Sequence, residues 1–326
     1  MAQAVTVYRW DDEGAPQIVN GMNRDVLNVL DKCLVEGYGT KQALGWVKTH
    51  SGDASNPRAA YSNVGGSGNY LVISSKNGTN DDSGLHVRSA HSVPSLDSLY
   101  REGYTQSIRV FERNKYWMII GTEKAFYFFS AFEGTYNEKS YYTASFFAGD
   151  ISNSQGNDTG RFICFASSID KQELNPPTND TDKYGENLEY MCSISRARLA
   201  SDLALKIWDA DGEEHVVEYA IEKPYEGLSS SSLNGMPNVN IALPFYVYFK
   251  NGESTSDRVG TPCIYSTLQP YIRGTLPGLI STKIAYDKTL DYPATINMPD
   301  QPHYLLRNSV GYSPSNIMLA TESWDD

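Results

Sequence analysis

The stretch that most constrains the fold is residues 116–132, YWMIIGTEKAFYFFSAF. Two short apolar runs flank a segment that begins at Gly121, and runs of β-branched and aromatic residues split in this way are typical of a β-hairpin. Apolar residues occupy both alternating sets of positions, as in Trp117 against Met118, so we predict a strand pair that is covered on both faces. Glu-Lys is not the pair that a tight primed turn prefers, so the turn should be slightly longer than two residues.

The clearest helical pattern lies at residues 23–36. Its apolar residues follow the three-and-four spacing of one buried helix face: Val26, Leu27, Val29, Leu30, Cys33 and Leu34. Asn23 is the expected N-cap, and Asp25 places a negative charge in the first turn, where the helix dipole favours it. Gly37 can supply the left-handed residue that ends a helix. We expect Trp46 to return over this helix and cover it.

The rest of the chain reads as short strands between turns. Alternating or short apolar runs predict strands at residues 3–9, 70–75, 85–90, 141–147, 161–166, 188–195, 203–208, 215–221, 238–249, 263–268 and 316–324. Residues 49–69 look like a loop, and residues 94–104 look like a connection with room for a helical turn. Pro244 predicts an edge or a bulge in its strand.

These patterns together predict a mainly β protein, with antiparallel sheets in a sandwich-like arrangement and one short N-terminal α-helix. Residues 168–187 form the most polar stretch and mark a candidate boundary. We therefore predict an N-terminal β-rich domain at residues 1–170, which includes the helix at 23–36, and a C-terminal β-rich part at residues 171–326. A single domain is the alternative, because 326 residues suit either arrangement.

Charge and composition narrow the classes of partner. The formal net charge of −12 repels nucleic acid at long range, so no direct nucleic acid contact is expected. The chain starts without a secretory pattern and has no apolar run of membrane-spanning length, so we expect no membrane partner and synthesis in a reducing cytoplasm. The four cysteines form no C-x-x-C pair and are predicted to be free thiols: Cys33, Cys164, Cys192 and Cys263.

Each motif that could indicate a catalytic or binding site lacks a residue or a spacing that the site requires. The calcium-loop echo that begins at Asp180 has Met191 where a bidentate Glu is needed. The Gly65–Gly68 loop lacks the Lys-Ser/Thr of a phosphate-binding loop and is predicted to be a flexible turn. Carboxylate pairs at 11–12 and 81–82, and the acidic run at 209–214, are expected to be solvated turns. The five histidines are scattered along the chain: His50, His86, His91, His215 and His303. We therefore predict no catalytic, cofactor-binding or metal-binding residue, no cofactor, and no enzymatic activity.

Several short motifs, spread along most of the chain, carry a family resemblance. They are Tyr8-Arg9-Trp10, Gly14-Ala15-Pro16, Leu30-Asp31, residues 33–39 (CLVEGYG), Lys41, Gly45-Trp46, residues 123–127 (EKAFY), residues 146–151 (FFAGDI), residues 273–278 (RGTLPG) and the terminal strand that closes at Trp324. In this order they resemble a family of tailed-bacteriophage virion structural proteins. Residues 168–260 contribute nothing to the resemblance.

The resemblance implies a structural role in a phage particle and brings no catalytic residue with it. We therefore expect a multi-copy virion subunit, made in the bacterial host cytoplasm, in the head and neck region (connector or collar) or on the capsid surface. Its partners would be other virion proteins and copies of itself, with no small-molecule ligand. The alternative is a host-surface glycan-binding (receptor-binding) module of the tail, since a tyrosine-rich surface suits both roles. A glycan depolymerase is a third hypothesis, which the absence of an internal repeat disfavours.

Overall fold

Two adjoining strands, β10 (Tyr116–Gly121) and β11 (Ala125–Ala131), form the hairpin that the sequence predicts, and they pair antiparallel. Three residues connect them, so the turn is longer than a two-residue primed turn, as the Glu-Lys pair indicated. The Thr122 hydroxyl stabilises this turn because it accepts hydrogen bonds from the backbone N–H groups of Lys124 and Ala125, at 3.1 and 3.3 Å.

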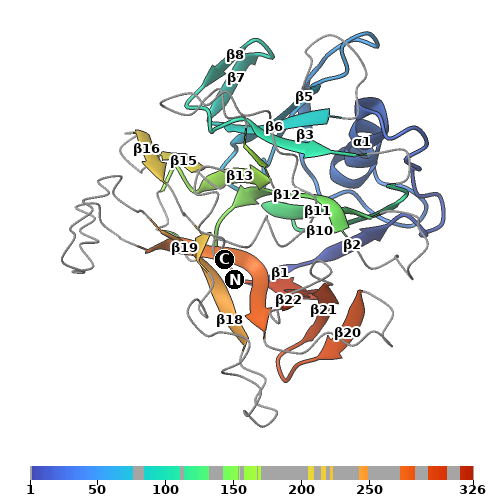
Figure 1. Ribbon diagram of the computed structural model, residues 1–326, viewed down its shortest axis with the longest axis vertical. Coiled ribbons are helices and arrows are strands. Elements are labelled where there is room, and N and C mark those ends of the chain that lie inside the picture. Colours follow the sequence, from blue (N-terminus) through green and yellow to red (C-terminus); the bar gives the residue numbers. More distant parts are fainter. Residues whose placement is uncertain are drawn as a thin grey trace.

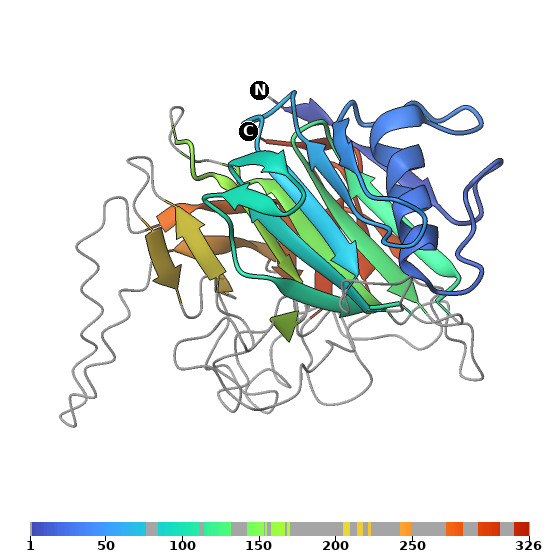
Figure 2. The same ribbon diagram turned by 90° about the horizontal axis from the view of Figure 1, so that it is seen from above.

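Three stacked antiparallel sheets form the framework of the part of the chain that the structure describes (Figures 1 and 2). The structure is a computed structural model that describes residues 2–75, 84–110, 114–131, 142–152, 154, 158–166, 168–169, 205–208, 214–217, 221–222, 242–248, 272–282, 293–306 and 316–325. Within these ranges the chain is mainly β with one short helical segment, which confirms the predicted fold class. No helix in them is long and apolar enough to span a membrane.

The middle layer, which we call the central sheet, has the strand order β13-β12-β11-β10-β2. Its remaining strands are β2 (Thr6–Arg9), β12 (Tyr142–Asp150) and β13 (Phe162–Ala166). The strands predicted at 141–147 and 161–166 are thereby confirmed. The strand predicted at 3–9 is split instead. Its start, β1 (Gln3–Ala4), pairs with β23 (Ser323–Trp324), so the two ends of the chain lie side by side (Figure 1).

The layer above, which we call the N-terminal sheet, has the order β14-β9-β6-β5-β4-β3. Its strands are β3 (Val47–Ser51), β4 (Ala59–Ser62), β5 (Tyr70–Ser75), β6 (Gly84–Ala90), β9 (Gln106–Arg109) and β14 (Ser168–Ile169). The predictions at 70–75 and 85–90 are confirmed. The loop predicted at 49–69 is wrong in part, because β3 and β4 lie there. The small residues of β4 have weak strand propensity. They adopt a strand because they pair with β5.

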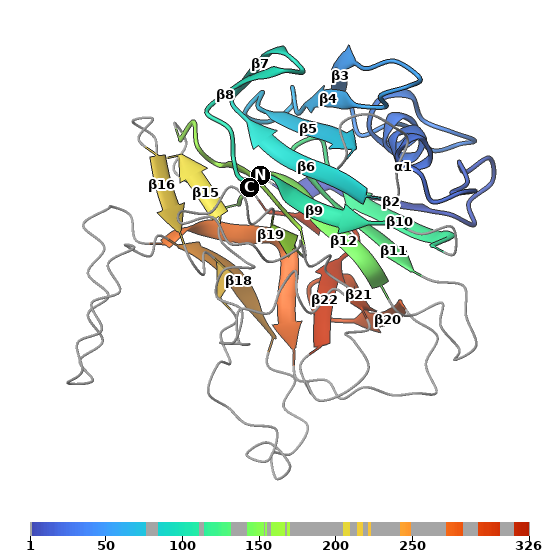
Figure 3. The same cartoon turned by 45° about the horizontal axis from the view of Figure 1, so that its top comes forward.

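Residues 94–104 also differ from the prediction. Instead of a connection with a helical turn, the chain forms a small hairpin from β7 (Ser92–Ser95) and β8 (Ser98–Tyr100). Figure 3 shows this hairpin on the outer side of the N-terminal sheet.

The third layer, which we call the C-terminal sheet, has the order β17-β18-β19-β22-β21-β20. Its strands are β17 (Ile221–Glu222), β18 (Ala242–Tyr248), β19 (Ile272–Thr282), β20 (Ala294–Asn297), β21 (Pro302–Leu306) and β22 (Asn316–Ala320). A separate pair, β15 (Leu205–Trp208) and β16 (Glu214–Val217), lies near it. The register shifts next to Pro244, as predicted. The strands predicted at 188–195 and 263–268 lie outside the described residues.

Each face of the central sheet packs into its own apolar core. One face, with Trp117, Ile119 and Phe128, packs against the helix and the inner face of the N-terminal sheet. The opposite face, with Met118 and Tyr127, packs against the C-terminal sheet. The alternation seen in the sequence therefore reflects burial on both sides. Residues from before and after position 170 share the second core, whichever way the chain is divided into domains.

The helical segment begins as α1 (Asn23–Leu30) and ends as a π-helical turn, η1 (Asp31–Glu36). Its six predicted core residues are all buried. The chain then returns as expected, since the Trp46 backbone N–H donates to the Leu34 carbonyl at 3.0 Å. The last turn thus gains a partner for a carbonyl that a helix end leaves unpaired.

The prediction of Asn23 as N-cap is wrong. Met22 occupies that position, and Asn23 is buried as the first helical residue. The Asp25 side chain instead holds the segment that leads into the helix. Its carboxylate accepts hydrogen bonds from the backbone N–H groups of Asn20 and Val19, at 2.8 and 3.2 Å. At the other end, Gly37 adopts a φ of +83°, the positive value predicted for the residue that ends the helix.

Truncation of Phe128 tests the central position of the hairpin. This ring is fully buried and stacks on Phe146 with 5.2 Å between ring centroids. Phe128→Ala should lower the free energy of unfolding by about 3–5 kcal/mol, because the cavity adds to the lost transfer energy. The control is Val64→Ala, since Val64 is 57% exposed. Urea denaturation curves that coincide for Phe128→Ala and the wild type would contradict this placement.

Candidate functional site

The adjacent carboxylates at 11–12 serve the local structure of the β2 end. Asp11 forms an exposed ion pair with the Arg9 guanidinium at 2.9 Å. Asp12 accepts hydrogen bonds from the Arg9 backbone N–H and the Tyr38 hydroxyl, both at 2.8 Å. Burial raises the pKa of Tyr38, and the hydrogen bond to Asp12 raises it further, so this phenol stays protonated as a donor. The pair at 81–82 and most of the acidic run at 209–214 lie outside the described residues, as does the calcium-loop echo at 180.

Two of the histidines contact residues close to them in the sequence. His50 contacts the Thr49 hydroxyl at 3.0 Å, and His303 contacts the Gln301 carbonyl at 2.9 Å. Within the described ranges, no three His, Cys, Asp or Glu side chains lie close enough together to hold a metal ion. The predicted lack of metal-binding and catalytic residues stays a prediction for the chain as a whole.

Two of the four cysteines, Cys33 and Cys164, lie in the described part of the chain, and both are buried free thiols. Burial raises the pKa of each thiol. Cys192 and Cys263 lie outside the described residues, so the prediction for them is untested.

This burial predicts slow thiol chemistry. Cys33 and Cys164 should resist a maleimide reagent in the native protein and react fully in denaturant, because the reactive thiolate is disfavoured and inaccessible. Peptide mass spectrometry after timed labelling measures both sites, with a small accessible peptide thiol as the reagent control. Rapid native labelling of Cys33 would contradict the docking of the helix.

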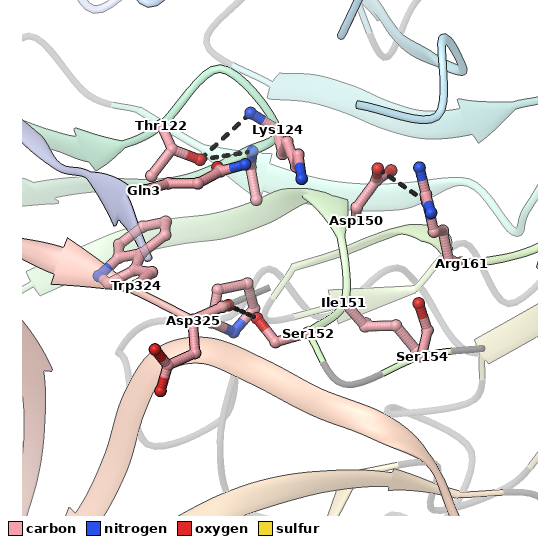
Figure 4. A pocket seen from close by; sticks show the side chains of 12 residues that line it. Gln3, Thr122, Lys124, Asp150, Ile151, Ser152, Ser154, Arg161, Trp324 and Asp325 are labelled. Atoms are coloured by element: carbon pink, nitrogen blue, oxygen red, sulfur yellow. Dashed lines mark hydrogen bonds and ion pairs between the residues drawn. The ribbon is translucent and has the colours of Figure 1, made fainter. Parts of the chain in front are cut away.

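A pocket of about 240 Å³ opens where the central sheet, the C-terminal sheet and both chain ends meet (Figure 4). Polar and charged side chains of Lys124, Asp150, Arg161 and Asp325 line it. These groups are of the types that act in acid–base catalysis. Whether they are available for it depends on the hydrogen bonds that each of them already makes.

Asp150, which ends β12, is saturated with hydrogen-bond donors. One carboxylate oxygen receives the Asn63 amide and the Ser67 hydroxyl, at 2.9 and 2.6 Å. The other receives the Ser67 backbone N–H at 2.7 Å and the Arg161 guanidinium at 3.1 Å. A buried carboxylate with this many donors works as a structural acceptor. We call this cluster the Asp150 clasp, since it holds the loop between β4 and β5 onto the central sheet.

The clasp also accounts for the glycine-rich loop at 65–68. Its backbone N–H at Ser67 points at an anion, as in a phosphate-binding loop, but the anion is the protein's own Asp150. A Cβ on Gly66 would lie 2.6 Å from both the Asp150 carboxylate and the Asn63 amide, so only glycine allows this approach. The loop is therefore a turn, as predicted, but its hydrogen bonds to Asp150 hold it in place, so the expectation of a flexible turn is wrong.

The RGTLPG motif at 273–278 joins the C-terminal sheet to the central sheet. The Arg273 guanidinium forms a buried ion pair with Asp158 and donates to the Trp208 carbonyl at 3.0 Å. Thr275 exchanges two backbone hydrogen bonds with Ser152, both at 2.9 Å.

The same motif continues to the end of the chain. The Pro277 carbonyl accepts the Tyr127 hydroxyl of the central sheet at 3.0 Å. Gly278 has a φ of +64°, and a Cβ there would lie 2.1 Å from the indole nitrogen of Trp324. We call residues 273–278 and their partners the seam, because they connect two sheets and the terminal strand pair.

Sequence reasoning missed the chemical roles of Asp150, Asp158 and Arg273. Both Asp150 and Arg273 lie in motifs that carry the resemblance, which was the available signal. Asp158 gave none, since its polar turn looks exposed in the sequence although the side chain is buried.

The chain matches no known family model, and the curated proteins include no match to it.

Loss of the buried ion pair tests the seam. Arg273→Met should lower the free energy of unfolding by about 3–5 kcal/mol, because it leaves the Asp158 carboxylate buried without its cation. The control is Lys32→Met, which removes the exposed ion pair with Glu36 and should cost at most about 1 kcal/mol. Equal small losses for the two variants would contradict a seam held by Arg273.

Proposed function

We propose that this protein is a multi-copy structural subunit of a tailed-bacteriophage particle, in the neck or on the capsid surface, without enzymatic activity. It acts through contacts with copies of itself and with other virion proteins. One observation carries the proposal. The motifs that resemble virion structural proteins coincide with the positions where the sheets are joined, rather than with a reactive site.

Motifs from several parts of the chain supply contacts that join the layers. In the FFAGDI motif, Phe146 and Phe147 enter opposite cores, and Asp150 is the centre of the clasp. In the RGTLPG motif, Arg273 and Pro277 bind the neighbouring layers. The GAP motif near the N-terminus does the same, because the Pro16 carbonyl accepts the Trp117 indole N–H at 2.8 Å.

This distribution favours a scaffold. An enzyme needs reactive groups kept available in a cleft, whereas the acidic groups of the 240 Å³ pocket include an Asp150 that already accepts four hydrogen bonds. The net charge of −12 keeps a free subunit soluble before assembly.

Purified particles provide the test. Mass spectrometry of gradient-purified virions of the encoding phage should find the protein in several copies per particle. The polar stretches at 168–187 and 227–240 should be cut by protease in the isolated subunit and protected in the particle, because neighbouring subunits cover them. Absence from washed virions, or identical cleavage in both states, would contradict the proposal.

A further inference from the structure

The hairpin of β7 and β8 stands apart from the three layers (Figure 3). Among the described strands, these two pair only with each other, and their register shifts between Ser92 and Ser95. Most of their residues are exposed. A two-stranded hairpin is only marginally stable in water by itself, so its order depends on what holds it to the sheet.

Few apolar side chains hold the hairpin to the outer face of the N-terminal sheet. Val93 is buried there, and Leu96 and Leu99 are partly buried, against Ala60 and Val72 of the sheet. This cluster is separate from the two cores that unite the three layers. A region with few buried apolar contacts opens locally at a lower free energy than global unfolding requires.

An exposed ion pair fastens the tip of the hairpin. The Arg58 guanidinium, just before β4, donates to both carboxylate oxygens of Asp97. This hydrogen bonding holds the pKa of Asp97 below its usual range, so the pair stays charged near neutral pH. The Asp97 side chain is 77% exposed, so dissolved salt screens the attraction between the two charges.

The base of the hairpin combines backbone strain with anchoring contacts. Arg101, directly after β8, has a φ of +49°, the only positive φ of a non-glycine residue in the described ranges. Such a conformation costs free energy, which is released when the chain opens there. The Arg101 guanidinium also lies over the rings of Tyr100 and Trp208, and Glu102 pairs with Arg88 at 2.5 Å. The base is therefore suited to act as a hinge when the tip is released.

We propose that β7–β8 is a flap that detaches from the N-terminal sheet while the three layers stay folded, with the Arg58–Asp97 ion pair as its latch. Detachment exposes the apolar strip of Ala60, Val72 and Ala90 on the outer face of that sheet. Because the latch is exposed, ionic strength sets the fraction of molecules in which the flap is open. The proposal does not rest on the virion role, since it concerns one hairpin of the isolated chain.

A thiol placed under the flap measures its opening. Val93→Cys puts a side chain of similar size at the covered face, where a maleimide reagent reaches it only when the flap is open. Cys33 of the same molecule reports global unfolding, because it is buried in the core between the helix and the sheets. Peptide mass spectrometry after timed labelling of the full chain measures both sites, and each rate is divided by that of a small peptide thiol under the same conditions.

The two thiols should differ in rate and in urea dependence. The thiol of Val93→Cys should react faster than Cys33, with little dependence on low concentrations of urea, because flap opening exposes little surface. Phe128→Ala, added to Val93→Cys, should accelerate labelling of Cys33 alone. The Phe128 ring packs in the core of Cys33 and remains packed when the flap opens.

Variants of the ion pair test the latch. Asp97→Asn, added to Val93→Cys, should raise the labelling rate at position 93 about twofold to fivefold, the effect expected for one exposed ion pair. Salt at about 1 M should raise the rate of Val93→Cys by a similar factor, and by less once Asp97→Asn is present. The matched control is Glu36→Gln, which removes the exposed ion pair with Lys32 and should leave the rate unchanged.

Two results would overturn the proposal. One is labelling of Val93→Cys at the rate of Cys33 with the same urea dependence, because the hairpin would then open only in global unfolding. The other is a rate that neither Asp97→Asn nor salt changes, because the ion pair would then not be the latch. Neither result bears on whether the protein is found in virions, so the two proposals fail separately.

Discussion

The burial of β10 and β11 on both faces is the constraint on which the other layers depend. A strand pair with apolar side chains on both sides cannot remain at a surface, so it requires one layer above and another below. The helix and the N-terminal sheet cover Trp117, Ile119 and Phe128, and the C-terminal sheet covers Met118 and Tyr127. The three-layer arrangement therefore follows from one seventeen-residue segment more than from any other part of the chain.

Apolar layers can slide on one another, and polar contacts fix how these layers meet. The Asp150 clasp sets the position of the N-terminal sheet, and the Arg273–Asp158 ion pair sets that of the C-terminal sheet. Both contacts join residues far apart in the sequence, and both bury charge that is satisfied only in one arrangement. Both contacts lie near the paired chain ends, so one region of the protein fixes how the three sheets are placed relative to one another.

The sequence predicted those parts of the fold that are determined by residues close together in the chain. The hairpin, the helix face at Val26 and Leu30, and the bulge at Pro244 have strong periodic or steric signals, and all are present. Strand β4 has weak propensity and forms because β5 pairs with it. Strand β19 contains a proline and two glycines, which argue against a strand. Gly278 nevertheless leaves the space that the Trp324 indole occupies, and the Pro277 carbonyl accepts the Tyr127 hydroxyl. The clasp and the seam depend on which distant residues meet, and no single-sequence pattern carries that information.

Native-state hydrogen exchange measures most directly whether the central sheet and the seam unite the layers. The account predicts that amides of β10, β11 and β19 exchange only through global unfolding, with one shared free energy and one shared denaturant dependence. Arg273→Met should then separate β19 from the other two strands, because it removes the buried ion pair that links the sheets. If β19 and β22 of the wild-type protein exchanged together at a lower free energy than β10 and β11, the C-terminal sheet would be an independent unit, and the account would be wrong.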